Sequence, residues 1–286
     1  MSADSIKTVA VLGAGTMGNG IAHVFARSGY QVLLRDIDKK FLDRALGTIS
    51  KNLEREVGKN KITEAERSAA LARIQPVTDT AALAGADFVV EAVPEQLDLK
   101  VRLLKEVDGV VGPSVILASN TSSISITQLA ARTSRPDRFI GMHFMNPVPM
   151  MTLVEVINGA ATSDATFATT MALCEKLGKT AVSVNDSPGF VSNRVLMPLI
   201  NEAAFAVMEG VAEPAAVDAV MKLGMNHPMG PLQLADFIGL DVCVEILDVL
   251  LRGFGDPKYR ACPLLRKYVA AGWLGRKSGR GFYTYQ

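Results

Sequence analysis

The sequence predicts an α/β protein in which a doubly wound parallel sheet, carrying a helical-hairpin insert, is followed by an all-α C-terminal domain. Three observations predict this fold. Short apolar, β-branched runs alternate with helical patterns as far as about residue 186, as repeated βαβ units require. A long charged insert interrupts the alternation after the second run. Only long helical patterns follow, so we expect a sheet domain over residues 1–186 and a helical domain over 187–286.

The expected strands are short runs, several of them apolar on both faces, as buried parallel strands are. In chain order they are KTVAVLG, QVLLRD, DFVVEAV, SVILASN, RFIGMHF, TLVEVI and TAVSV. The insert comprises DKKFLDRALGTISKNLEREVGK and TEAERSAALARI, where Thr63 and Glu66 have capping-box spacing. It predicts two helices that project from the sheet. The helices expected after residue 186 are NRVLMPLINEAAFAVMEG, PAAVDAVMKLG and LQLADFIGLDVCVEILDVLLRGF.

Composition excludes several classes of protein. The 286 residues are 49% hydrophobic and 21% charged with a formal net charge of +1, which is typical of a globular protein and offers no basic field for nucleic acid. Cys174, Cys243 and Cys262 form no CxxC pair, so we expect no disulfide framework and no metal site, and a reducing cytoplasm fits best. The first apolar run leads directly into a glycine motif, which indicates a strand rather than a signal peptide, and no stretch resembles a membrane span.

The glycine motif after the first run predicts a dinucleotide site. Gly13, Gly15 and Gly18 form GxGxxG between an expected strand and an expected helix, a spacing that lets the backbone approach a pyrophosphate at a helix N-terminus. The second run ends in Asp36, 18 residues after Gly18, where a carboxylate can bind the adenosine ribose. Because this carboxylate would repel a 2′-phosphate, NAD is favoured over NADP, although cations nearby weaken the preference.

Polar residues also follow the later runs. They are Glu91 and Glu95, residues 119–123, and His143. Ligands bind at the carboxyl ends of strands in open parallel sheets, whereas single Ser or Thr residues often only cap helices. Oxidation of an alcohol by NAD requires a base, and histidine titrates in the right range. Glu155, the lone acid of TLVEVI, could orient His143, but spacing alone leaves two unrelated polar residues as an equal alternative.

Several motifs occur in one order along the whole chain: GAGTMGNGIA, SNTSSI, GMHFMNPVPMM, LVEVI, DSPGFVSNRV and GWLGRKSGRGFYTY. With these motifs the chain resembles the L-3-hydroxyacyl-CoA dehydrogenase family, especially its bacterial 3-hydroxybutyryl-CoA dehydrogenases. The resemblance implies a Rossmann-type domain, a helical domain that forms a homodimer, and NAD-dependent interconversion of 3-hydroxyacyl-CoA and 3-ketoacyl-CoA in fatty acid or butanoate metabolism.

The resemblance also implies roles for individual residues. His143 would be the general acid and base, Glu155 would orient it, and Ser122 and Asn193 would bind the reacting part of the substrate in a cleft between the domains. The implied cofactor contacts are Gly13, Gly15, Thr16, Met17, Gly18, Asp36, Glu95, Lys100, Ser122, Asn146 and Lys277. The implied coenzyme A contacts are Lys51, Asn52 and Lys59, since ammonium groups suit phosphates. Without the resemblance, these three read as solvated helix residues.

Two other functions stay open at this point. A related hydroxyacid dehydrogenase would use a lysine of its helical domain as acid and base, which the asparagine of SPGFVSNR disfavours. A redox sensor or structural protein could bind NAD without turnover. Such a protein would not need His143, Glu155, Ser122 and Asn193 together. The preference for a four-carbon acyl chain follows from the resemblance alone.

Overall fold

The computed structural model describes residues 2–285. Contacts between residues divide the chain into two compact units, a sheet unit that ends at Asp186 and a helical unit that begins at Ser187. In the part of the chain that is described, no helix is both long enough and apolar enough to span a bilayer.

The sheet unit contains an eight-stranded sheet with the order β3-β2-β1-β4-β5-β6-β7-β8. The chain leaves β1 toward β2 and later returns to form β4 on the other side of β1, so the carboxyl ends of β1 and β4 border the crevice where open sheets bind ligands. The strands are β1 (Thr8–Leu12), β2 (Gln31–Arg35), β3 (Ile74–Val77), β4 (Phe88–Glu91), β5 (Ile116–Ser119), β6 (Phe139–Phe144), β7 (Leu153–Asn158) and β8 (Thr180–Asn185).

Two features of the sheet differ from the prediction. β3 was not expected, because Gln75 and Pro76 interrupt its apolar pattern; it is an edge strand, where a proline is tolerated. β7 runs antiparallel to β6 and parallel to β8, so the sheet is only mostly parallel. The segment between β6 and β7, residues 145–152, is too short for the crossover that two adjacent parallel strands need.

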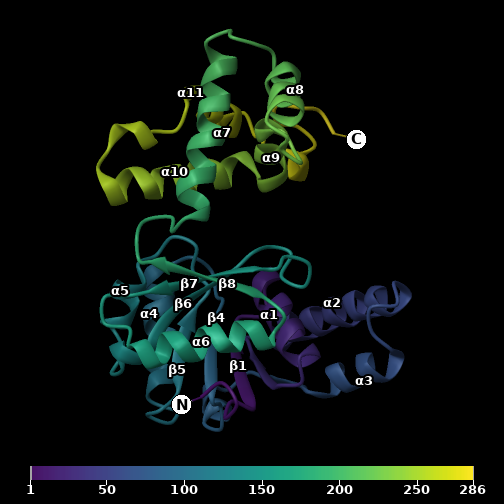
Figure 1. Ribbon diagram of the computed structural model, residues 1–286, viewed down its shortest axis with the longest axis vertical. Helices are drawn as coiled ribbons and strands as arrows, with labels where there is room; N and C mark the ends of the chain where they lie inside the picture. The colour runs from purple at the N-terminus through teal and green to yellow at the C-terminus, as the bar shows by residue number, and fades with distance from the viewer. Residues whose placement is uncertain (1, 286) are drawn as a thin grey trace. The chain divides into compact units, whose positions relative to one another are not determined.

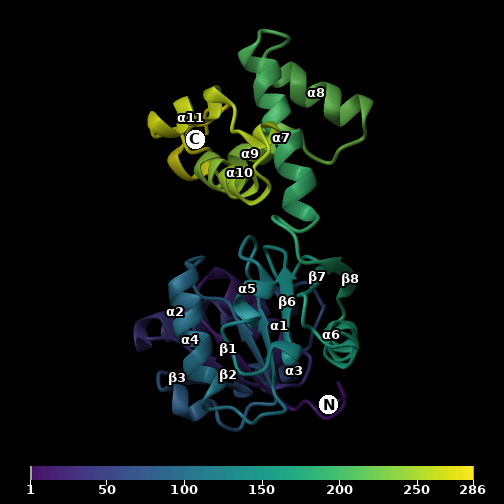
Figure 2. The ribbon, with the colours of Figure 1, turned by 90° about the vertical axis from the view of Figure 1, so that its left-hand side faces the viewer.

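Helices cover both faces of the sheet, with α4 and α6 on opposite sides (Figure 2). The helices of this unit are α1 (Thr16–Arg27), α2 (Lys39–Gly58), α3 (Glu64–Ala72), α4 (Leu97–Asp108), α5 (Ile126–Ala130) and α6 (Asp164–Lys176). As predicted, α2 and α3 form a hairpin that projects from the sheet (Figure 1). The capping box of α3 is confirmed, because Thr63 Oγ1 accepts from the Glu66 amide and the Glu66 carboxylate accepts from the Thr63 amide at 2.7 Å.

The helical unit consists of α7 (Ser192–Met208), α8 (Pro214–Gly224), α9 (Pro231–Ile238), α10 (Leu240–Phe254) and α11 (Pro263–Ala270). The third predicted helical stretch is in fact two helices, because Gly239 has a φ of 107°, which helical geometry does not allow. The C-terminal residues are tied to α9 by Asp236, which accepts hydrogen bonds from the amides of Phe282 and Tyr283 and from the Tyr285 hydroxyl.

Candidate active site

The glycine turn between β1 and α1 presents bare backbone to the crevice. Gly13 has a φ of 98°, a conformation that favours glycine. A Cβ on Gly18 would lie 1.7 Å from the Gly13 carbonyl oxygen, so the turn can close only without a side chain there. Gly15 caps α1 without any side-chain hydrogen bond to the first turn. The first amides of α1 are therefore available to an anion, and the helix dipole favours one there.

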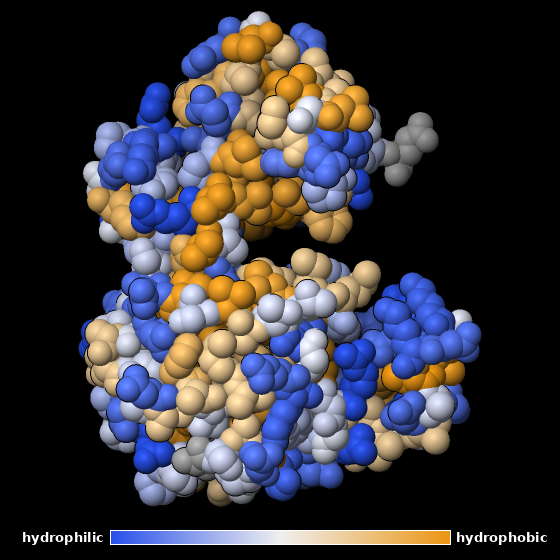
Figure 3. All heavy atoms as spheres, in the orientation of Figure 1, coloured by the Kyte–Doolittle hydropathy of each residue, from blue (hydrophilic) through white to orange (hydrophobic). Residues whose placement is uncertain are grey.

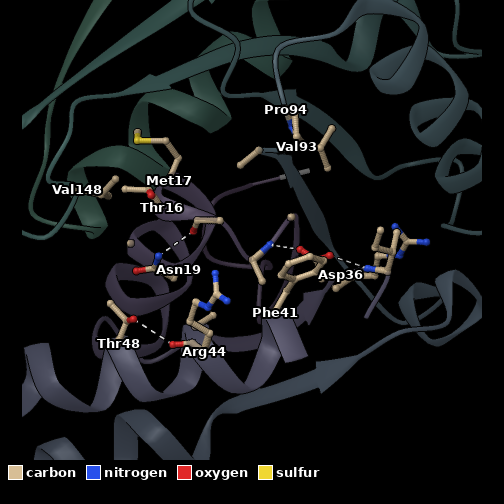
Figure 4. A pocket seen from close by; sticks show the side chains of 18 of the residues that line it. Thr16, Met17, Asn19, Asp36, Phe41, Arg44, Thr48, Val93, Pro94 and Val148 are labelled. Carbon is tan, nitrogen blue, oxygen red and sulfur yellow. Dashed lines mark hydrogen bonds between the residues drawn. The ribbon is translucent and has the colours of Figure 1, made fainter. Parts of the chain in front are cut away.

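A cavity of about 930 Å³ opens beside this turn (Figure 4). Of the residues predicted to bind the cofactor, it is lined by Gly13, Gly15, Thr16, Met17, Asp36 and Asn146. The Asp36 carboxylate accepts hydrogen bonds from the amides of Ala14 at 2.6 Å and Ile37 at 2.7 Å, which fix its orientation at the end of β2. A helix N-terminus without a side-chain cap and an oriented carboxylate, both lining one cavity, suit a dinucleotide such as NAD.

One face of α2 forms a wall of the cavity that sequence reasoning missed. Phe41, Arg44, Thr48 and Asn52 all line it, and Figure 4 shows the first three side by side along the helix. Their spacing of three or four residues is the signal that could have found them. Asn52 is one of the predicted coenzyme A contacts. The other two, Lys51 and Lys59, are exposed and lie outside the lining of the cavity.

His143 and Glu155 lie opposite each other on β6 and β7. Residues directly opposed on antiparallel strands project from the same face of a sheet, so the reversal of β7 brings the two side chains together. His143 Nδ1 and a carboxylate oxygen of Glu155 are 2.8 Å apart, with the two residues 8% and 2% exposed. A hydrogen bond from the Phe144 amide to Asn120 Oδ1, at 2.9 Å, fastens this end of β6 to the loop after β5. The carboxylate thus fixes the orientation of the imidazole ring through Nδ1.

Glu95 organises the loop that contains Ser122. One of its carboxylate oxygens accepts from the amides of Ser122 at 2.9 Å and Ser123 at 3.0 Å and from the Thr121 hydroxyl at 2.5 Å. Burial alone would raise the pKa of Glu95, but the Lys100 ammonium and these hydrogen bonds together hold it below its usual value. Glu95 is therefore a carboxylate anchor for the loop after β5.

Lys100, predicted to contact the cofactor, is 1% exposed. Its ammonium group lies 2.7 Å from Glu91, 3.0 Å from the Val93 carbonyl oxygen and 3.2 Å from Glu95. The other Glu91 oxygen accepts from the Ser119 hydroxyl at 2.6 Å. The ammonium group of Lys100 thus makes two hydrogen bonds and a further ion pair with protein oxygens, and Lys100 is not among the residues that line the cavity. Glu91 is a buried partner to which sequence reasoning gave no role.

Two predicted residues belong to the helical unit. Asn193 is in the first turn of α7, and its amide donates to the Gly189 carbonyl at 3.1 Å. Gly189 and Phe190 have φ values of 74° and 51°, so the SPGF motif forms the sharp turn that starts the helix. Lys277 lies 2.6 Å from the Asp241 carboxylate at the start of α10. The turn before α7 thus places Asn193, and Asp241 pairs with Lys277.

Comparison with known proteins places this arrangement in a family. The family model of the 3-hydroxyacyl-CoA dehydrogenase NAD binding domain matches residues 8–187, and that of the 3-hydroxyacyl-CoA dehydrogenase C-terminal domain matches residues 189–285. The chain belongs to the 3-hydroxyacyl-CoA dehydrogenase family. Like the family, it is an NAD-dependent oxidoreductase, and the cavity beside the glycine turn lies in the unit that the NAD binding domain model matches.

Several relatives of this dehydrogenase are similar over nearly their whole length. A probable 3-hydroxybutyryl-CoA dehydrogenase of Bacillus subtilis is 57% identical, over 98% of both chains. The 3-hydroxybutyryl-CoA dehydrogenase of Bradyrhizobium diazoefficiens is 53% identical, over 98% of this chain and 96% of the relative. The crystal structure of (S)-3-hydroxybutyryl-CoA dehydrogenase from Ralstonia eutropha has a TM-score of 0.97 and 55% identity, covering 99% of this chain and 100% of the other.

Proposed function

We propose that this dehydrogenase interconverts (S)-3-hydroxyacyl-CoA and 3-ketoacyl-CoA, with (S)-3-hydroxybutyryl-CoA and acetoacetyl-CoA as its preferred pair, and that His143 is the general acid and base. The observation that carries the proposal is the buried 2.8 Å contact between His143 and Glu155. It stands in the same unit as the NAD cavity, whose lining includes Asn146, three residues after His143. The names of the similar proteins support the choice of substrate.

The contact with Glu155 decides which nitrogen of His143 does the chemistry. With Nδ1–H donated to the carboxylate, Nε2 carries a lone pair and accepts the proton of the substrate's 3-hydroxyl group. The imidazolium formed is stabilised by the buried carboxylate, and it returns the proton when the keto group is reduced. When bound, NAD would supply the hydride acceptor for the carbon that carries this hydroxyl group.

Other residues bind and orient the reactants in this proposal. Ser122 and Asn193 hydrogen-bond the reacting oxygen and the thioester region, stabilising charge on oxygen. Lys51, Asn52 and Lys59 meet the phosphates and polar groups of coenzyme A. The cofactor is held by the cavity residues, by Glu95 and by Lys277. Lys100 acts by holding Glu95, because its buried ammonium group already contacts three protein oxygens.

We further propose that residues 1–186 and 187–286 act as an NAD-binding domain and as a domain for substrate binding and dimerisation. The helical unit exposes large apolar side chains, an unusual feature unless a surface is covered. They include Val211, Val220, Leu223 and Met225, which are 60–86% exposed, and Figure 3 shows apolar side chains on the surface of this unit. A homodimer that covers them fits this composition. The unpaired, buried cysteines suit the cytoplasm.

The proposal is tested by following NADH absorbance at 340 nm with acetoacetyl-CoA, with free acetoacetate, and with NADPH in place of NADH. We expect rapid oxidation of NADH with the thioester and slow reaction with the free acid or with NADPH, because coenzyme A phosphates and the 2′-hydroxyl beside Asp36 are recognised. A folded protein that binds NADH but turns over neither substrate would instead favour an NAD-binding sensor.

A further inference from the structure

Lys179 is a buried cation with an unusual set of partners. It lies between α6 and β8 and is 7% exposed. Its ammonium group donates to the carbonyl oxygens of Val148 at 2.6 Å and Met151 at 2.7 Å. Among the ion pairs of residues 2–285, none joins it to a carboxylate. Burying an ammonium group costs free energy unless hydrogen bonds compensate for the lost water. For Lys179, two backbone carbonyl groups provide these hydrogen bonds.

Both of its acceptors belong to the β6–β7 loop, residues 145–152. This loop contains Pro147 and Pro149, which lack an amide donor. It folds back on itself through hydrogen bonds from the amides of Met150 and Met151 to the Pro147 carbonyl, both at 3.0 Å. The loop has no strand or helix of its own to satisfy its remaining carbonyl groups, and Lys179 satisfies two of them.

The β6–β7 loop is also held from a second side. A Cβ on Gly20 of α1 would lie 2.8 Å from the Cβ of Val148, so α1 packs closely against the loop. After Lys179, the Thr180 amide donates to the Thr152 carbonyl at 2.8 Å, which continues the attachment into β8. The loop is therefore clamped between α1 and the start of β8.

The position of this loop matters to the site. It joins the strand that carries His143 to the strand that carries Glu155, and its residues 146–149 line the NAD cavity. We propose that Lys179 is a positioning residue of the dehydrogenase: by holding the Val148 and Met151 carbonyl groups, it sets the position of residues 146–149, which form part of the cavity wall. The expected change in kcat rests on the proposed function, whereas the expected change in NADH binding does not.

The test replaces Lys179 by Met, which keeps the length of the side chain and removes the donor, and by Arg, which keeps donors and charge. The matched control is Lys176→Met, three residues earlier on α6, where an exposed lysine pairs with Asp4. NADH binding is measured by fluorescence titration well below the melting temperature of each variant, and kcat and both KM values are measured with acetoacetyl-CoA.

We expect Lys179→Met to raise the Kd of NADH and lower kcat, each by roughly tenfold, with the KM of acetoacetyl-CoA changed less than about twofold. Lys179→Arg should recover part of both losses and Lys176→Met should match the wild type. A Gly20→Ala variant, which pushes the same loop from α1, should reproduce the changes in NADH Kd and kcat, and it serves as the test if Lys179→Met does not fold.

A purely structural role would lower the melting temperature and leave the NADH Kd and kcat of the folded protein unchanged, and that result would overturn the inference. Equal losses in Lys176→Met would overturn it as well, because they would trace the effect to any lost lysine. If the wild type does not turn over acetoacetyl-CoA, the proposed substrate is wrong. The NADH titration still decides whether Lys179 positions the β6–β7 loop for cofactor binding.

Discussion

The buried Lys100–Glu91 pair makes the strongest prediction for stability. Lys100→Met removes an ammonium group that contacts three protein oxygens and leaves Glu91, 0% exposed, as a carboxylate without its cation. Removing one partner of such a pair costs about 3–5 kcal/mol in the free energy of unfolding. For a unit of this size, that loss corresponds to a fall of about 6 to 20 °C in melting temperature. Most of this loss in stability comes from the buried, uncompensated charge of Glu91 rather than from the lost contact itself.

Calorimetry and urea unfolding at matched protein concentrations measure the effect. The double variant Glu91→Gln, Lys100→Met tests its cause, because the amide can still accept from Ser119 but buries no charge. We expect the double variant to recover about 1–2 kcal/mol relative to Lys100→Met alone. The reasoning is refuted if Lys100→Met unfolds within about 1 kcal/mol of the wild type, or if the double variant is the less stable of the two.

Three further predictions concern single carboxylates. Asp36→Asn should raise the KM of NADH about tenfold and reduce the preference over NADPH; unchanged KM values for both cofactors in steady-state assays would contradict this. Asp236→Asn should lower the free energy of unfolding by about 1.5–3 kcal/mol in urea, since its carboxylate, 1% exposed, accepts three hydrogen bonds from the C-terminal residues. The pKa of the Glu95 carboxyl is lower in the folded than in the unfolded protein, so its ionised form stabilises the fold above the unfolded pKa, and this contribution is lost as the pH falls through the folded pKa. The free energy of unfolding of the wild type should therefore fall more steeply below about pH 4.5 than that of Glu95→Gln. Parallel acid-unfolding profiles of the two proteins would exclude this role.

Much of the fold could be predicted because local signals agree with the global structure. The glycine motif lies between β1 and α1, and the charged insert forms α2 and α3. β3 escaped prediction because Pro76 breaks a pattern that only an edge position allows. The reversal of β7 was missed for another reason. Hydrophobic runs report burial and not direction, and only the length of the segment between β6 and β7 indicates it.

The site divides in the same way. Spacing along the chain identified Asp36, and the register of β6 and β7 now pairs His143 with Glu155, which the sequence alone left undecided. Phe41, Arg44 and Thr48 of the α2 wall were missed, and Glu91 was recognised only as a polar residue at the end of a strand, without its buried partner Lys100. The spacing of the α2 residues puts them on one face of a helix, but which segment that face meets, like the partner of a buried acid, depends on how distant segments pack. The contacts of Lys179 could not be predicted from the sequence either, because its acceptors are backbone carbonyl oxygens, which every residue has.

The central claim is that His143, oriented by Glu155, moves the substrate proton. The most direct test is steady-state reduction of acetoacetyl-CoA by NADH in His143→Gln, together with NADH titration of the same protein. Loss of a general base in a preorganised site predicts a fall in kcat of roughly 10²–10⁴-fold, with the Kd of NADH changed little because His143 does not line the cavity. A folded His143→Gln protein that binds NADH and turns over at the wild-type rate would contradict the account.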